Sequence, residues 1–185
     1  MSRAWIPCIA VAALLPLAAC KREAPPPPVA DPVTQASPGK PATKTTVERP
    51  SLAVQTLDGT TFDLAAHRGQ WVVVNYWATW CSPCLKEMPE LSALDAMREH
   101  VTVIGLAYED STPDTMRAFL QEHPVVYPVA LVDVYNPPAD FDTPRGLPLT
   151  YLIAPDGRIA RKYTGPVSAR MLEEGIAEAG GPKQG

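Results

Sequence analysis

The chain has 185 residues, of which 46% are hydrophobic, and a formal net charge of −4 at pH 7. It contains no basic run interleaved with aromatic side chains, which argues against a nucleic-acid partner. Residues 51–180 are predicted to form one domain, since a stretch of about 130 residues is an ordinary domain size. Residues 181–185 are then expected to be a short tail.

The first 19 residues are predicted to be an export signal. Arg3 supplies a positive charge, and an apolar run follows from Ala4 to Ala19, directly before Cys20. This ending resembles the lipobox of bacterial lipoproteins, whose cysteine is acylated and becomes the first mature residue. A transmembrane helix and an ordinary signal with an incidental cysteine are the alternatives. A spanning helix needs about 20 apolar residues, and this run is short and carries two prolines, so we favour lipidation of Cys20.

Residues 20–50 are predicted to be a proline-rich disordered tether. The segment contains four consecutive prolines, Pro25 to Pro28, and further prolines separated by Ala, Thr, Val and Lys. Such a composition lacks the apolar surface needed to offset the entropy of ordering, and proline favours an extended form that rises about 3 Å per residue. A tail without function is the alternative. With an acylated Cys20 at its start, the segment is expected to hold a catalytic domain away from a bilayer.

The remaining sequence predicts alternating strands and helices. In chain order we expect a hairpin of strands 52–57 and 60–64, a strand 71–77, a helix 82–100, a strand 101–107, a helix 112–123, a strand 129–132, a hairpin of strands 149–154 and 159–163, and a helix ending near 179. The nearly continuous apolar run of 71–77 is typical of a buried central strand. In helix 82–100, Leu91, Leu94 and Met97 are spaced for one buried face, and Pro89 predicts a kink. This order indicates an α/β fold with a mixed central sheet flanked by helices and an N-terminal β-hairpin extension.

Cys81 and Cys84 form a Cys-x-x-Cys pair where strand 71–77 is predicted to meet helix 82–100. The spacing puts two sulfurs one helical turn apart, within bonding reach, and the start of a helix stabilises the thiolate of the first cysteine. Once Cys8 leaves with the signal and Cys20 is acylated, no second pair remains for a cysteine-rich zinc site. A structural disulfide or half of a metal site is the alternative to a redox-active pair. A cysteine pair after a buried central strand indicates a thioredoxin-like fold.

Two segments carry a resemblance to a known family. Residues 75–89, which include Trp-Cys-Ser-Pro-Cys, closely resemble the signature of the membrane-tethered TlpA/ResA/CcmG-type (DsbE-like) thioredoxin-like proteins. Residues 146–153, followed by 156–159, resemble the second signature of that family. The resemblance covers residues 51–179 and implies a thioredoxin-like fold with thiol-disulfide oxidoreductase activity.

The candidate catalytic residues are Cys81, Cys84 and Glu87. Cys81 is the expected nucleophile and Cys84 the resolving cysteine. Glu87 follows Cys84 on the same helix face, and the resemblance implies that it has a function; we expect it to move protons for the pair. A glutamate that only stabilises the helix dipole is the alternative.

The candidate substrate-binding residues surround the cysteine pair. The resemblance implies that Pro148 is cis, faces the pair and helps to dock an extended substrate. Trp80, Pro83 and Leu147 are the other expected substrate contacts. Arg145 is a candidate for stabilising an anion near Pro148, with a solvated loop arginine as the commoner alternative.

Two positions depart from related proteins. Asn75 stands where cytosolic thioredoxins carry a buried aspartate, and an amide cannot accept a proton at neutral pH. The loop 135–145 does not follow the usual sequence of the family.

The leading hypothesis is an exported reductant of specific client disulfides, lipid-anchored at the periplasmic face of a bacterial membrane. The resemblance implies apocytochrome c or copper-site assembly proteins as clients, and a membrane thiol donor that reduces the pair again. Because no histidine lies between the cysteines, we expect a potential nearer the roughly −270 mV of thioredoxin than the roughly −120 mV of DsbA. A general disulfide reductase or isomerase and a Cu(I) carrier are alternatives, and a dithiol pair disfavours a peroxidase. No cofactor or resident metal is expected.

Overall fold

The computed structural model describes residues 47–182. The predicted signal peptide, the lipidation site Cys20 and nearly all of the predicted tether lie outside these residues. At the end of that tether, the backbone N–H of Val47 donates to the carbonyl of Asp140, and the N–H of Ile159 donates to the carbonyl of Glu48. Residues 47–50 therefore contact the domain.

A five-stranded mixed sheet forms the centre of the domain, with the order β5-β4-β3-β6-β7. The strands are β3 (Trp71–Trp77), β4 (Val101–Tyr108), β5 (Val129–Val132), β6 (Leu149–Ile153) and β7 (Ile159–Thr164). The first three are parallel to one another, and β6 and β7 run antiparallel to their neighbours. Every residue of β3 is buried, as its continuous apolar run predicts for a central strand. The predicted thioredoxin-like α/β fold is confirmed.

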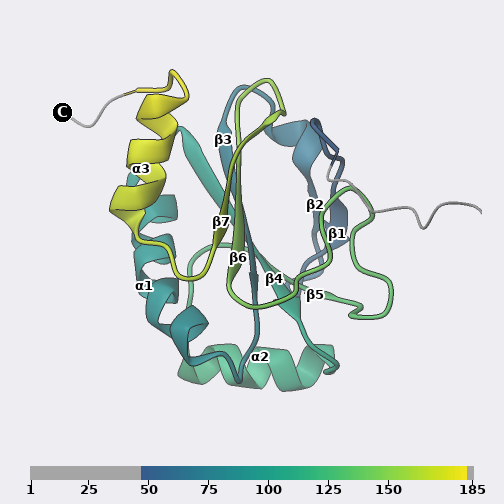
Figure 1. The fold of residues 1–185 in the computed structure, drawn as a ribbon. Helices are drawn as coiled ribbons and strands as arrows, with labels where there is room; N and C mark the ends of the chain where they lie inside the picture. The colour runs from purple at the N-terminus through teal and green to yellow at the C-terminus, as the bar shows by residue number, and fades with distance from the viewer. Residues whose placement is uncertain (1–46, 183–185) are drawn as a thin grey trace, which may run out of the picture. The chain divides into compact units, whose positions relative to one another are not determined.

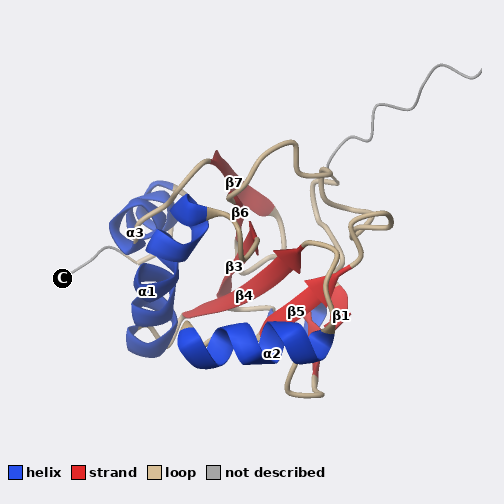
Figure 2. Ribbon diagram, turned by 90° about the horizontal axis from the view of Figure 1, so that it is seen from below, coloured by secondary structure: helices blue, strands red, loops and turns tan. Residues whose placement is uncertain are grey.

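Three helices flank the sheet: α1 (Ser82–Met97), α2 (Pro113–Glu122) and α3 (Ala169–Glu178). Helices α1 and α3 lie side by side against one face, and α2 crosses one end of the molecule (Figures 1 and 2). The caps explain where α2 and α3 begin, because the hydroxyls of Thr112 and Ser168 accept hydrogen bonds from backbone N–H groups three residues later.

The predicted N-terminal hairpin is confirmed as β1 (Ala53–Gln55) and β2 (Thr61–Asp63), which pair antiparallel. A short 3-10 helix, η1 (Leu64–His67), follows it and was not predicted. The hairpin attaches to the edge strand β5 through an antiparallel bridge between Thr56 and Ala130. It thereby covers part of a sheet edge that would otherwise be exposed to pairing with another chain.

The predicted end of the first helix was wrong. Helix α1 ends at Met97, whose side chain is 70% exposed, while Leu91 and Leu94 are buried as expected. The chain turns at Arg98 so that Val101 can start β4, and Met97 leaves the buried face. Helix α1 is continuous through Pro89, and the kink there stays a prediction.

Candidate active site

Cys81 and Cys84 lie where β3 ends and α1 begins. Cys81 is the N-cap residue of α1, and the backbone N–H of Cys84 donates to its Sγ over 3.3 Å. Residues at this position accept the otherwise unpaired N–H groups of the first helical turn. In the structure the two sulfurs form a disulfide, with Cα atoms 5.3 Å apart.

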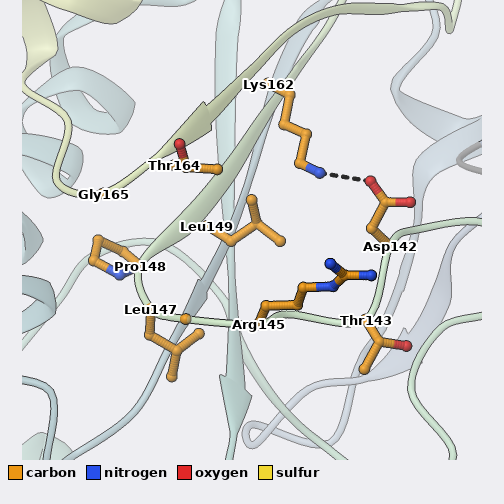
Figure 3. A pocket seen from close by; sticks show the side chains of 10 residues that line it. Asp142, Thr143, Arg145, Leu147, Pro148, Leu149, Lys162, Thr164 and Gly165 are labelled. Carbon is orange, nitrogen blue, oxygen red and sulfur yellow. Dashed lines mark hydrogen bonds and ion pairs between the residues drawn. The ribbon is translucent and has the colours of Figure 1, made fainter.

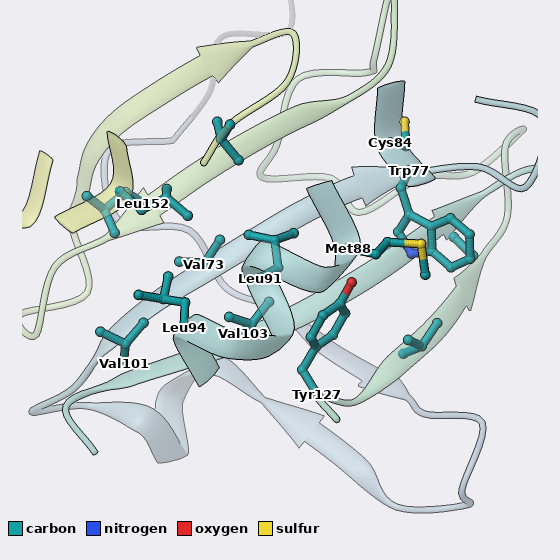
Figure 4. Close-up of a cluster of buried hydrophobic side chains, with 14 of the residues drawn as sticks. Val73, Trp77, Cys84, Met88, Leu91, Leu94, Val101, Val103, Tyr127 and Leu152 are labelled. Atoms are coloured by element: carbon teal, nitrogen blue, oxygen red, sulfur yellow. The ribbon is translucent and has the colours of Figure 1, made fainter. Parts of the chain in front are cut away.

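The two cysteines differ in exposure. Cys81 retains 4% of its accessible surface, whereas Cys84 has none. Cys84 lies near Trp77 at one end of the cluster between α1 and the sheet, which also contains Met88 and Leu91 (Figure 4). A molecule that approaches the disulfide from solvent therefore meets Cys81 first.

The segment before β6 forms the rim beside the disulfide. The Leu147–Pro148 peptide bond is cis, which confirms the expectation from the family resemblance. Leu147 packs against the cluster that contains both cysteines, and it lines a pocket together with Trp80, which is 70% exposed. Pro83 is exposed on the first turn of α1 and lines neither of the pockets beside Pro148.

Glu87 is buried beneath the cysteine pair within a small polar network. Its Oε1 accepts a hydrogen bond of 2.8 Å from the amide of Asn75, and its Oε2 accepts one of 2.8 Å from the backbone N–H of Val167. The same Asn75 amide also donates to Thr150 Oγ1 over 2.9 Å. The four residues come from β3, α1, β6 and the loop before α3, so the network connects the centre of the sheet to both covering helices.

Burial raises the pKa of Glu87 from 4.5 to about 7, although the hydrogen bonds from Val167 and Asn75 oppose the shift because they favour the carboxylate. Glu87 therefore exchanges a proton near neutral pH. Asn75 Oδ1 has no hydrogen-bond partner within residues 47–182. A protonated Glu87 carries an O–H group. Asn75 Oδ1 can accept a hydrogen bond from it once the amide rotates.

Glu109 is a residue that the sequence reasoning missed. It follows β4, and its carboxylate accepts two hydrogen bonds from Thr79, one from the backbone N–H over 3.0 Å and one from the hydroxyl over 2.8 Å. Thr79 lies two residues before Cys81. The carboxylate thus fixes the loop that carries Trp80 and Cys81. The two residues are 30 positions apart, and only the parallel pairing of β3 with β4 brings them together.

Across residues 47–182, no group of three or more His, Cys, Asp and Glu side chains is arranged to hold a metal ion. None of the helices described there has the length and apolarity that crossing a bilayer requires.

Comparison with known proteins agrees with this geometry. The sequence profile of the AhpC/TSA family matches residues 39–175. The chain belongs to the AhpC/TSA family. It is 31% identical to the thiol-disulfide oxidoreductase ResA of Bacillus cereus over 127 residues, which cover 68% of this chain and 73% of that protein. It is 37% identical to the thiol:disulfide interchange protein DsbE of Allochromatium vinosum over 109 residues, 58% of this chain and 59% of the relative.

A solved structure supports the same assignment. A DsbE-type thiol:disulfide interchange protein from Chlorobium tepidum superposes with a TM-score of 0.62 at 26% identity, covering 71% of this chain and 94% of the other. The chain is therefore a thiol-disulfide oxidoreductase of the ResA and DsbE type, as its sequence motifs predicted.

Proposed function

We propose that this chain is an exported, lipid-tethered reductant of client protein disulfides that acts through Cys81 and Cys84. The observation that carries the proposal is the unequal burial of two bonded sulfurs at a helix N-terminus. Cys81 retains accessible surface and receives a backbone hydrogen bond, whereas Cys84 has no accessible surface. This arrangement suits an exposed nucleophile and a buried resolving thiol.

The reaction transfers two electrons from the reduced pair to the client. The thiolate of Cys81 attacks one sulfur of the client disulfide, and the other client sulfur leaves as a thiolate. The thiolate of Cys84 then attacks Sγ of Cys81, and the first client sulfur leaves in turn. The products are the Cys81–Cys84 disulfide and a client dithiol. A membrane thiol donor returns two electrons to the pair.

Glu87 is the proposed proton acceptor and donor for this exchange. Its pKa of about 7 lies near the working pH, where a group transfers protons most effectively. It lies one helical turn after Cys84 on the buried face of α1. The neighbouring Asn75 cannot take this role, since an amide has no titratable proton at neutral pH.

The client docks against Trp80, Pro83, Leu147 and Pro148, which surround Cys81 in sequence or in space. Apocytochrome c haem-attachment cysteines and copper-site assembly proteins are the proposed clients, on the strength of the resemblance to TlpA/ResA/CcmG-type proteins. Acylated Cys20 and the proline-rich segment hold the domain at the periplasmic face of a bacterial membrane.

Redox titration combined with trapping tests the reductase role. The Cys81/Cys84 couple should have a potential nearer about −270 mV than about −120 mV. A Cys84→Ala variant should accumulate mixed disulfides with clients, and a Cys81→Ser variant, the matched control, should accumulate none. A strongly oxidising potential, or equal trapping by both variants, contradicts the proposal.

Membrane fractionation of the full chain tests the tether. The wild-type chain should sediment with membranes and incorporate labelled fatty acid, and a Cys20→Ala variant should do neither. Replacement of Cys8 by alanine serves as the control and should change nothing. A Cys20→Ala variant that is still acylated refutes the assignment of that cysteine.

A further inference from the structure

A pocket of about 860 Å³ opens beside the cis-proline. One wall comes from Asp142, Thr143 and residues 145–149, which lead into β6, and the other comes from Lys162 and Thr164 of β7 and from Gly165, which follows it (Figure 3). Because Leu147 also packs against the cluster that contains Cys81, a polypeptide bound to Cys81 can extend into this pocket.

The side of the pocket formed by Lys162 and Asp142 is fixed by several contacts. Lys162 Nζ lies 2.5 Å from Asp142 Oδ2 and 5.6 Å from the centre of the Tyr151 ring. The backbone N–H of Asp142 donates to the Tyr151 hydroxyl over 3.2 Å. Lys162 and Asp142 therefore form an ion pair with each other. A ligand binds either side chain only after this ion pair breaks.

Arg145 differs from these two side chains. It is exposed, and its guanidinium makes no hydrogen bond or ion pair with any other residue in the described range 47–182. The charged residues that line the pocket are Arg145, Lys162 and Asp142, which leaves a surplus of one positive charge. The chain as a whole is negative, so this is a local reversal of sign. Arginine presents a planar set of donors that matches a carboxylate.

Arg145 also stands at a border between two cavities. A second pocket of about 410 Å³, whose lining includes Trp80, Tyr108, Glu109 and Asp110, shares Arg145, Gly146 and Leu147 with the first. A client segment that passes over the Leu147–Pro148 bond must therefore pass Arg145. The two carboxylates of the second pocket make it negative, so the positive surplus is confined to the pocket beside Pro148. Arg145 lies three residues before Pro148, in a bent segment that contains the cis bond. A client side chain that meets Arg145 therefore lies near the reacting cysteine in the client sequence.

We propose that Arg145, in the pocket beside Pro148, selects clients that carry an aspartate or glutamate on one flank of their disulfide. The inference rests on the proposed reductase function and adds a substrate class to it. Arg145 binds the client and takes no part in the electron transfer.

Disulfide peptides that differ at one position test the selection. A glutamate, a glutamine or a lysine is placed two, three or four residues from one cysteine, on either side, and kcat/KM is measured at low salt. The wild-type enzyme should favour the glutamate peptide over the lysine peptide by about two- to fivefold at the matching position, the range of an exposed ion pair. High salt should remove the preference.

Charge exchange identifies the residue responsible. An Arg145→Gln variant should lose the preference, and an Arg145→Glu variant should favour the lysine peptide. Arg170→Gln is the matched control, because Arg170 is an exposed arginine on α3 that pairs with Glu174, and it should keep the wild-type preference. A wild-type enzyme without preference, or an Arg145→Gln variant that retains it, overturns the inference.

Reduction of a small neutral disulfide distinguishes a failure of the Arg145 proposal from a failure of the proposed reductase function. Hydroxyethyl disulfide carries no charge and should be reduced equally by the wild type and by the Arg170→Gln control. If it is reduced while peptide charge has no effect, Arg145 selectivity is refuted and the reductase function stands. If neither it nor any peptide is reduced, the reductase function fails, and the inference fails with it.

Discussion

The two faces of the central sheet are packed with different chemistry. On strand β3, Asn75 and Trp77 point toward α1 and α3, where Glu87, Thr150 and the cysteine pair are buried. The opposite face of β3 contributes Tyr76 to a second cluster, in which Phe141 and Tyr151 are its aromatic neighbours. Among residues 47–182, the only buried charged side chain is Glu87, on the first face.

This difference shows how one strand serves two purposes. Successive side chains of a strand point to opposite faces, so β3 supplies the polar network with one set of residues and a dry core with the other. Burying a charged side chain costs free energy unless hydrogen bonds satisfy it. Among the described residues, Glu87 beneath the disulfide is the only buried side chain of this kind. Substitutions on the two faces should therefore have separable effects.

The largest expected effect is on the aromatic face. A Tyr76→Ala substitution removes a fully buried ring and should lower the free energy of unfolding by about 3–5 kcal/mol, the range seen for large aromatic truncations. Urea unfolding measures the loss. The potential of the Cys81/Cys84 couple in the folded protein should stay at the wild-type value.

Tyr76→Phe is the control for that experiment. The Tyr76 hydroxyl is buried without a hydrogen-bond partner in the described part of the chain, so its removal should leave stability equal or higher. A Tyr76→Ala variant whose potential shifts markedly would show that the two faces are not independent.

The next effect concerns pH and lies on the polar face. The folded pKa of Glu87 is about 7 against an ordinary 4.5, so the folded state binds more protons than the unfolded state between these values. The stability of the wild type should therefore fall by about 3 kcal/mol as pH rises through this window, at about 1.4 kcal/mol per unit of pKa shift. A Glu87→Gln variant, which stays neutral, should lack this contribution.

Urea unfolding of the disulfide form between pH 4 and pH 8.5 measures this difference. The stability curves of the wild type and the Glu87→Gln variant should diverge above pH 4.5 and become parallel again above pH 8. The variant should also exchange disulfides more slowly at neutral pH. Parallel curves throughout would mean that Glu87 titrates normally, and unchanged exchange rates would remove its proton-transfer role.

A smaller effect is expected at the loop before the cysteines. Glu109→Ala removes the acceptor of two hydrogen bonds from Thr79 and should cost about 1–2 kcal/mol of stability. Because the loop carries Trp80 and Cys81, kcat/KM for protein clients should fall several-fold, while reduction of a small disulfide changes less.

Glu109→Gln tests the cause of that loss. Its amide oxygen can accept from the Thr79 N–H, and its amide N–H can donate to the Thr79 hydroxyl, so the contact survives without the charge. Activity near the wild-type value is expected. A glutamine variant as impaired as the alanine variant would assign the effect to charge instead of loop position.

The smallest effect is at the contact between α1 and α3. Arg98 Nε lies 2.6 Å from Glu173 Oε1, and the arginine is partly exposed. Glu173→Gln should lower stability by less than about 1 kcal/mol, and the difference should shrink in high salt because exposed ion pairs are screened. Thermal unfolding at two salt concentrations checks this. A difference that does not depend on salt would indicate a packing effect.

The elements of this fold could be predicted because their signals are local. The apolar run of β3, the Asp-Gly pairs at 58–59 and 156–157, and the capping hydroxyl of Ser168 each lie within a few residues of the structure they determine. The cysteine pair was predicted for the same reason, since its chemistry depends on a spacing of three. The cis state of Pro148 came from the family resemblance, because sequence physics favours trans for any one proline.

The features that were missed depend on which strands become neighbours. The contact of Glu109 with Thr79 requires β3 and β4 to be parallel and adjacent, and the contact of Lys162 with Asp142 joins β7 to the loop before β6. The spacing of Met97 predicts a core position, but the residue at which the helix ends depends on where the following strand begins. Glu87 was a candidate because it shares a helix face with Cys84, but its burial beside Leu91 and Leu94 was not predicted, since a periodicity argument considers only apolar residues.

The complete burial of Cys84 has a consequence for timing. No second client molecule can reach that sulfur, so the forward release of a reduced client from Cys81 proceeds through attack by Cys84 inside the protein. The rate of release is therefore first order and does not respond to the concentration of waiting clients. The lifetime of the mixed disulfide is set by how fast Cys84 loses its proton and reaches Sγ of Cys81. A higher concentration of clients does not shorten that lifetime.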